Sequence, residues 1–499
     1  MHQPDRPWQI VSRRLRRAML LAGAAVALAG CTSLTNMGLD SDLSPSARPV
    51  IADNVRTGRL ARIGAAQHPR ILASYGGEYS DTRLERMVAG IVGRLVTVSD
   101  NPSQVYQVSI LDTPVINAFA LPGGYLYVSR GLLAVANDSA ELGAVIAHEM
   151  AHVTANHGVL RQQREAEAVL ASRVVSEVLS DKAAGERALA RGKVALAQFS
   201  RNQELEADAI GIAAMGEAGF DPYAAADFQQ AMSAFNAFRS GSSAQENSLD
   251  FLSTHPSTPQ RVSLALGHAR KLGAPGTVGE RDRNAYLAGI DGMLFGDSPD
   301  EGYVRGNTYA HAELGIAFEF PAGFEIENRP EAVLAARASD GAGIRFDGVD
   351  VPSTQALTDY LLSGWVEGLD RSSVRATKVN GLDAAVARAT VGRWAFDVTV
   401  VRGPAQVYRV LVAVPVGSAA LEPLAQNSRT GFRLLSDAEK AELKPLRIRV
   451  VRAGAGDTVD TLSRTMLGST DRAGFFRVLN GLEPDERLVP GAYYKTVTY

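Results

Sequence analysis

Two histidines and a glutamate stand at a spacing that suits metal-assisted hydrolysis. His148 and His152 are four residues apart, and Glu149 directly follows the first histidine. On an α-helix, side chains at this spacing project from one face, so both imidazoles can bind one Zn²⁺. Glu149 lies one residue further round, where it can take a proton from a water molecule whose pKa zinc lowers to about 7. The pattern predicts a hydrolytic centre with a single zinc ion.

A catalytic zinc needs a third protein ligand, and an acidic pair further along the chain can supply it. Glu204 and Asp208 are also four residues apart, in a stretch of helical character. One carboxylate could bind the metal while the other holds the far ring nitrogen of a ligand histidine. The alternative is a solvated acidic helix face. Because Cys31 is the only cysteine, histidine and carboxylate must hold any metal.

The helix expected around the histidine pair has signals at both ends. Asp138 can cap its first turn, with Glu141 three residues on, and Gly158 stands where the helix would stop. His157 would then lie at the helix end, where a cation suits the helix dipole. The sequence therefore places the histidine pair near the end of one helix.

The elements before this helix also follow from pattern. Residues 82–98 have apolar side chains at helical spacing, and 105–111 alternate like a strand. Two short strand-like runs, 115–121 and 125–128, are joined by Pro122-Gly123-Gly124, which indicates a hairpin.

Three ordered motifs within roughly residues 50–272 resemble the peptidase family that includes the CAAX prenyl protease, HtpX and the periplasmic BepA-like proteins. They are the histidine pair with its glutamate, the acidic pair followed by Gly211, and residues 117–124. The resemblance implies a gluzincin fold with one zinc ion and assigns a role to each polar residue: zinc ligands His148, His152 and Glu204, general base Glu149, and Asp208 behind a ligand.

The same resemblance implies how substrate would bind. An edge strand would hold protein or peptide substrates by β-augmentation, through Asn117, Ala118, Phe119 and Ala120. Membrane members of the family carry transmembrane helices, and this chain has no matching segments, so it is similar to the soluble envelope branch.

A later histidine is a candidate regulator. His255-Pro256, ahead of Arg261, is similar to the His-Pro segment of BepA-like proteins, where a loop histidine can close over the zinc as a fourth ligand. The resemblance implies this role for His255 and a supporting role for Arg261. The alternative is a loop histidine beside a turn-forming proline. The remaining histidines have no partner at ligand spacing and are expected at the surface: His68, His268 and His311.

The beginning of the chain resembles a bacterial lipoprotein signal. Four arginines (Arg13, Arg14, Arg16 and Arg17) precede an apolar stretch over 18–30 that is too short to span a membrane. It ends Leu-Ala-Gly before Cys31, which is similar to a lipobox, so 1–30 would be removed and 31–50 would be a tether. The alternative is an ordinary secretory signal. Lipidation at Cys31 would anchor the protein on the periplasmic face of the envelope, and Thr32 favours the outer membrane over the inner one.

Composition and pattern set the remaining organisation. A net charge of −3 over 499 residues argues against nucleic acid as a partner. We expect a multidomain chain, with a mainly α (α+β) metallopeptidase domain, an α+β domain with a distant similarity to PsbP-like proteins, and a small α/β module that resembles LysM. The expected boundaries are 51–272 for the metallopeptidase, 273–302 for a linker with one short helix, 303–436 for the α+β domain and 446–499 for the LysM-like module.

Two functions are compatible with these features. The first is a zinc-dependent endopeptidase of the bacterial cell envelope that cleaves unfolded or misassembled envelope proteins. The second is a chaperone or assembly factor whose zinc site is latent. A LysM-like module would bind peptidoglycan, whereas a packing domain of the same fold would bind no glycan. A third possibility, a wall-binding structural lipoprotein, depends on that module alone.

Overall fold

The computed structural model describes residues 59–499 apart from 122, 179–181 and 242–249. The signal segment 1–30, the lipidation site Cys31 and the tether 31–50 lie outside the described residues, as does Pro122 of the expected turn. Within the part that is described, no helix has the length and hydropathy to cross a membrane.

A three-stranded sheet near the start of the described chain places β2 at an edge. β1 and β3 pair in parallel, and β3 pairs antiparallel with β2, which gives the order β1-β3-β2. The predicted hairpin is therefore confirmed, and so are the helix expected over 82–98 and the strand expected over 105–111. These first elements are α2 (Arg59–Ser74), α3 (Thr82–Thr97), β1 (Gln107–Leu111), β2 (Ala118–Leu121) and β3 (Tyr125–Ser129).

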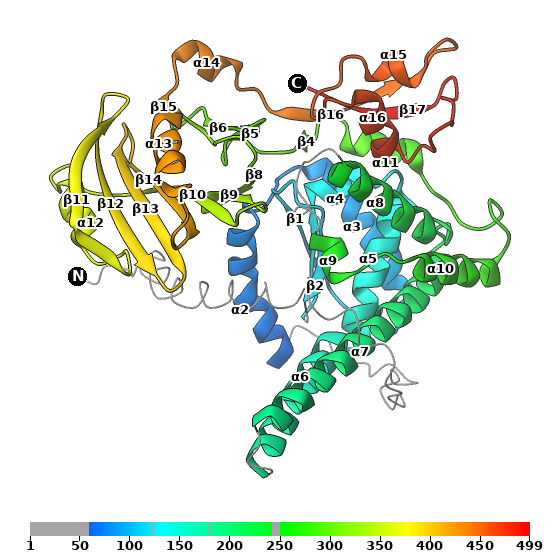
Figure 1. The fold of residues 1–499 in the computed structure, drawn as a ribbon. Coiled ribbons are helices and arrows are strands. Elements are labelled where there is room, and N and C mark those ends of the chain that lie inside the picture. The colour runs from blue at the N-terminus through cyan, green and yellow to red at the C-terminus, as the bar shows by residue number, and fades with distance from the viewer. Residues whose placement is uncertain (1–58, 122, 179–181, 242–249) are drawn as a thin grey trace, which may run out of the picture.

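Helices build the rest of this first body. α5 is its central helix and is buried along almost its whole length. α6 and α7 pack side by side and project together from the body (Figure 1). The helices are α4 (Arg130–Val135), α5 (Ser139–Thr154), α6 (His157–Val178), α7 (Lys182–Glu217), α8 (Ala224–Gly241), α9 (Asp250–Thr254), α10 (Pro259–Leu272) and α11 (Arg283–Ile290).

The start of α5 follows the sequence prediction, but its end does not. The Asp138 side chain accepts a hydrogen bond from the backbone N–H of Glu141, as expected of an N-cap. The expected stop at Gly158 is wrong, because α5 already ends at Thr154. Asn156 adopts a left-handed conformation (φ 56°), and α6 begins at the next residue, so Gly158 lies in the first turn of α6.

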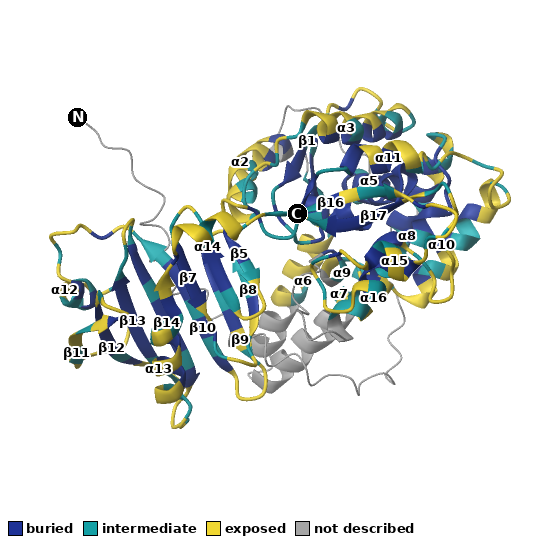
Figure 2. Ribbon diagram, turned by 90° about the horizontal axis from the view of Figure 1, so that it is seen from above, coloured by how far each residue is buried: buried dark blue, intermediate teal, exposed yellow. Residues whose placement is uncertain are grey.

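The second body is an α+β domain built on two antiparallel sheets. One has seven strands in the order β11-β12-β13-β14-β10-β9-β8, and the other has four in the order β15-β7-β6-β5. Figure 2 shows its buried residues concentrated along the strands. The strands are β5 (Tyr303–Arg305), β6 (Thr308–His311), β7 (Ile316–Glu319), β8 (Glu325–Arg329), β9 (Ala332–Arg337), β10 (Ala342–Val349), β11 (Leu369–Val379), β12 (Leu382–Val391), β13 (Trp394–Arg402), β14 (Val407–Pro415) and β15 (Phe432–Leu434), with helices α12 (Leu357–Leu362), α13 (Leu421–Gly431) and α14 (Asp437–Glu442).

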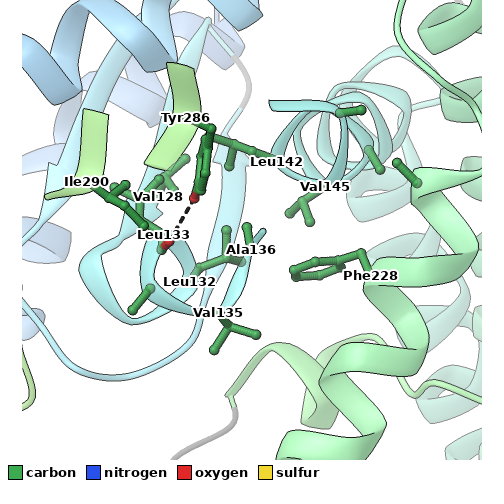
Figure 3. Close-up of a cluster of buried hydrophobic side chains, with 14 of the residues drawn as sticks. Val128, Leu132, Leu133, Val135, Ala136, Leu142, Val145, Phe228, Tyr286 and Ile290 are labelled. Carbon is green, nitrogen blue, oxygen red and sulfur yellow. Dashed lines mark hydrogen bonds between the residues drawn. The ribbon is translucent and has the colours of Figure 1, made fainter. Parts of the chain in front are cut away.

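The C-terminal unit packs directly on the first body. β16 pairs with β17 and also with β4, which precedes the α+β domain in the chain. One hydrophobic core contains side chains of both, from Leu84 on α3 to Phe476 on α16 and Val497 on β17. The segment expected as a linker contains α11 as its short helix, and Tyr286 of α11 is fully buried and donates to the carbonyl of Leu133 (Figure 3). The elements are β4 (Leu294–Phe295), β16 (Leu446–Arg452), α15 (Val459–Ser463), α16 (Arg472–Asn480) and β17 (Tyr493–Thr498).

Candidate metal centre

Four side chains from three segments converge on one point: His148, His152, Glu204 and His255. One ligand atom of each lies within 4.8 Å of all the others. The two Nε2 atoms of the histidine pair are 3.0 Å apart, and Glu204 lies 3.3 Å from each of them. Nδ1 of His255 lies 3.1 Å from His148 Nε2 and 2.9 Å from Glu204 Oε2. Ligand atoms of a tetrahedral zinc site with bonds of about 2.1 Å lie about 3.4 Å apart, so the donor set fits a zinc ion.

Two crossing helices and one loop hold these side chains. α5 carries the histidine pair and Glu149, and α7 carries the acidic pair, which confirms that both motifs are helical. At Gly211 of α7 a Cβ atom would lie only 3.1 Å from the backbone nitrogen of His148. The helices can therefore approach closely at the site because this residue has no side chain. His255 follows α9 in the link to α10, with its ring stacked on Phe251.

A buried ion pair, Asp208 with Arg261, contacts the cluster at Nδ1 of His148. Asp208 Oδ1 lies 3.0 Å from Nδ1 of His148. The guanidinium of Arg261 donates to both carboxylate oxygens of Asp208, at 2.7 Å each, and its Nη1 lies 3.1 Å from Glu204. Arg261 is only 6% exposed. The acidic pair is therefore buried in the site, and the solvated-face alternative does not describe it.

The electrostatics leave both carboxylates ionised at neutral pH. Burial raises the pKa of Asp208, but hydrogen bonds from Arg261 and His148 outweigh it and bring the pKa to about 2. The pKa of Glu204 lies well below its usual range, because hydrogen bonds with the surrounding histidines outweigh its burial. Burial lowers the pKa of His152 to about 3, which keeps that imidazole neutral and able to bind a metal. The pKa of His148 shifts in the opposite direction. Its contacts with the two carboxylates outweigh burial and raise its pKa to about 10.

Glu149 lies beside the cluster, and one of its carboxylate oxygens makes no hydrogen bond within the described part of the chain. It is 3% exposed, and its Oε1 has no hydrogen-bond partner among the described residues, although His255 Nε2 is 3.4 Å away. Burial raises the pKa of this carboxyl, partly offset by the nearby histidines and the backbone of Ala120 on β2. A carboxylate with a raised pKa and an open oxygen is suited to accept and return a proton.

The sequence of this region matches a known family. Residues 80–268 match the model of Peptidase family M48. This segment is an M48 peptidase domain. M48 metallopeptidases depend on zinc, and the cluster described above could hold the ion.

Several proteins similar to the M48 domain are named as proteases. The mitochondrial metalloendopeptidase OMA1 of Schizosaccharomyces pombe is 31% identical over 213 residues, which are 40% of this chain and 58% of that protein. The beta-barrel assembly-enhancing protease of Yersinia pestis is 29% identical over 227 residues, 44% of this chain and 45% of that protein. The Escherichia coli protein of the same name is 28% identical over 202 residues, 39% and 40% of the two chains. The similarity therefore covers about half the length of these relatives.

The residues predicted to bind substrate lie on or next to edge strand β2 of the M48 domain, each in a different environment. Asn117 is buried and contacts the hydroxyl of Tyr75, and Ala118 is also buried. Phe119 is partly exposed between Tyr75 and Tyr127. Ala120 is the one whose backbone reaches Glu149. The free edge of β2 thus runs beside the general-base candidate.

Two histidines outside the predicted ligand set are buried, contrary to expectation. His311 is 5% exposed in β6, where Nε2 contacts the carbonyl of Asp300, so its placement at the surface was wrong. His68 and His268 are partly exposed. His157 is 3% exposed, and burial lowers its pKa to about 4, so it is not a cation at a helix end. It lies behind His152, a position that no pattern in the sequence indicated because the helix break at Asn156 was not foreseen.

Proposed function

We propose that this protein is a zinc-dependent endopeptidase of the bacterial cell envelope, and that it cleaves unfolded or misassembled envelope proteins. The observation that carries the proposal is the convergence of four ligand groups beside the open oxygen of Glu149. In this reading His148, His152 and Glu204 are the zinc ligands, Glu149 is the general base, and Asp208 with Arg261 orients His148. The name and activity of the relatives point the same way.

The residues of the site divide the chemistry between them. Zinc, when bound, polarises the scissile carbonyl and lowers the pKa of the attacking water. Oε1 of Glu149 takes one proton from that water and delivers it to the nitrogen of the leaving amine as the C–N bond breaks. Asp208 holds the proton on Nδ1 of His148, which leaves Nε2 free as a ligand.

The edge of β2 is the proposed substrate site. Among the described residues β2 pairs with β3 alone, so backbone groups of its other edge could pair with an extended peptide over 118–120. This edge adjoins Glu149, so a peptide paired there would pass close to the ligand cluster. An extended backbone with unpaired N–H and C=O groups is far more available in unfolded proteins than in folded ones, which supports unfolded chains as the substrate class.

Removal of zinc tests the proposal directly. Treatment of the purified full-length protein with a zinc chelator should reduce cleavage of a fluorescently labelled unfolded casein by at least about 100-fold, because the polarising ion is lost. Adding back equimolar Zn²⁺ should restore the rate. A cleavage rate that is unaffected by chelation would exclude the proposed chemistry.

His255 blocks access to the proposed zinc site in this structure. Its ring lies within 3.4 Å of both Glu149 and Glu204, so it occupies the space in front of the general base. We expect His255→Ala to raise the cleavage rate several-fold, because a water molecule and a peptide carbonyl can then approach the ion. The measurement is the same casein assay at saturating zinc.

The control for this variant is His268→Ala, a partly exposed histidine on α10 that should leave the rate unchanged. If wild-type protein and His255→Ala both bind zinc and neither cleaves unfolded substrate, the endopeptidase proposal fails. The assembly-factor alternative would then account better for a site that His255 closes.

The location in the cell is part of the proposal. Lipidation at Cys31 would anchor the protein to the membrane, with the outer membrane favoured. The β-α-α-β order of 446–499 agrees with the expected LysM-like module, and binding of peptidoglycan by that module would hold the enzyme near the wall. Protein recognition is the role proposed for 303–436.

A further inference from the structure

His157 connects a proposed zinc ligand to a carboxylate on α7. Its Nδ1 lies 2.9 Å from Nδ1 of His152, and the two rings meet edge to face with centroids 4.8 Å apart. On the other side of the ring, Nε2 of His157 lies 3.4 Å from Oε2 of Glu206. The three groups form a continuous chain of contacts that leads away from the metal centre.

The ligand role of His152 determines the proton positions in this chain. Nε2 of His152 faces the cluster, 3.0 Å from His148 Nε2 and 3.3 Å from Glu204 Oε1. A nitrogen that binds a metal offers its lone pair, so the ring proton of His152 is on Nδ1. His152 then donates to Nδ1 of His157, and His157 donates from its own Nε2 towards Glu206.

The backbone holds His157 in this place. The left-handed residue Asn156 turns the chain between α5 and α6, and its carbonyl accepts from the N–H of Leu160 in the first turn of α6. The carbonyl of His157 accepts a hydrogen bond of 2.9 Å from Nε2 of Gln203 on α7. Because the side chain of His157 is only 4% exposed, the ring has little freedom to leave His152.

The two ligand histidines of α5 therefore differ in what supports them. Nδ1 of His148 contacts the carboxylate of Asp208 directly, whereas Nδ1 of His152 contacts the His157 ring, which in turn contacts the carboxylate of Glu206. Such outer partners fix the orientation and tautomer of a ligand histidine, and their loss typically weakens metal binding by about 10- to 100-fold.

We propose that His157 is a positioning residue that fixes the ring orientation and tautomer of His152 and thereby tightens zinc binding. The inference rests on the proposed zinc site. It concerns metal affinity, so it can be tested without any measurement of cleavage.

The test compares zinc affinities of the full-length protein by competition with a chromophoric chelator. His157→Leu should bind Zn²⁺ about 10- to 100-fold more weakly than wild type, and its Co²⁺-substituted form should show an altered visible absorption spectrum. His157→Asn should recover most of the affinity, because its side-chain oxygen can accept the proton of His152 in place of Nδ1. His311→Leu removes an equally buried histidine from the α+β domain and should leave the affinity unchanged.

The unfolding midpoint of each zinc-free variant separates positioning from general destabilisation. Affinity of His157→Leu equal to wild type would overturn the inference. So would equal loss of affinity in the leucine and asparagine variants with matching loss of stability, since that pattern indicates packing alone. Failure of the wild-type protein itself to bind zinc would instead overturn the proposed function.

Discussion

Replacement of Glu149 by glutamine is expected to abolish cleavage of unfolded protein while leaving zinc binding intact. Glutamine has the same shape but cannot accept a proton at Oε1, and loss of a general base typically costs about 10²- to 10⁴-fold in rate. Zinc binding should persist because Glu149 is not one of the four converging ligands. The measurements are the initial rate on labelled unfolded casein and the zinc content of the dialysed protein.

Two observations would contradict this expectation. One is a Glu149→Gln protein that cleaves at more than about a tenth of the wild-type rate, well above the range for loss of a general base. The other is loss of zinc from the variant, which would make Glu149 part of the ligand set. Glu165→Gln is the matched control, because Glu165 is an exposed glutamate on α6 and should behave as wild type.

The same variant distinguishes the two functions in the cell. If proteolysis is the function, a strain that carries Glu149→Gln should resemble a deletion strain. If the protein acts as an assembly factor with a latent zinc site, the variant should resemble wild type, because its fold and its metal are retained. His255→Ala would affect growth only under the first alternative.

Local patterns predicted much of the site, and contacts between distant segments explain what they missed. The pairing of His148 with His152, and of Glu204 with Asp208, follows from helix geometry within five residues, so the spacing was sufficient. The burial of His157 depends on a single left-handed residue, Asn156, which ended α5 earlier than the glycine signal indicated. Asparagine adopts this conformation less often than glycine, so the stronger signal at Gly158 was misleading.

The relation of the C-terminal unit to the M48 domain was beyond local patterns altogether. An entire α+β domain separates the two units in the sequence. No pattern within 446–499 indicates which face of the C-terminal unit packs against the M48 domain. The decisive contact is Lys495 of β17, whose side chain is fully buried. Its Nζ donates to the carbonyls of Ala134, Val135 and Ala136, at 2.8, 3.0 and 2.8 Å.

These three carbonyls lie where α4 ends, just before the cap of α5. Carbonyls in the last turn of a helix have no partner within the helix, and a cation is favourable beside them. An ammonium group has three N–H donors, which matches the three acceptors. The C-terminal unit therefore supplies hydrogen bonds to backbone carbonyls just before the ligand-bearing helix of the M48 domain.

Lys495→Met should accordingly destabilise the M48 domain and not only the C-terminal unit. Methionine keeps the length of the side chain but removes all three hydrogen bonds. The carbonyl of Val135 keeps a bond from Nδ2 of Asn137. Those of Ala134 and Ala136 lose the bond from Lys495, at about 1–3 kcal/mol for each group that remains unsatisfied. We expect a loss of about 3–4 kcal/mol, which would raise the hydrogen-exchange rate of the α5 amides by about 10²- to 10³-fold when they exchange through unfolding of this core. Lys378→Met, at an exposed lysine of β11, should leave these rates unchanged. Faster exchange confined to 446–499 would show that the C-terminal unit unfolds alone. That result would contradict the prediction, because the unit would then not stabilise the M48 domain.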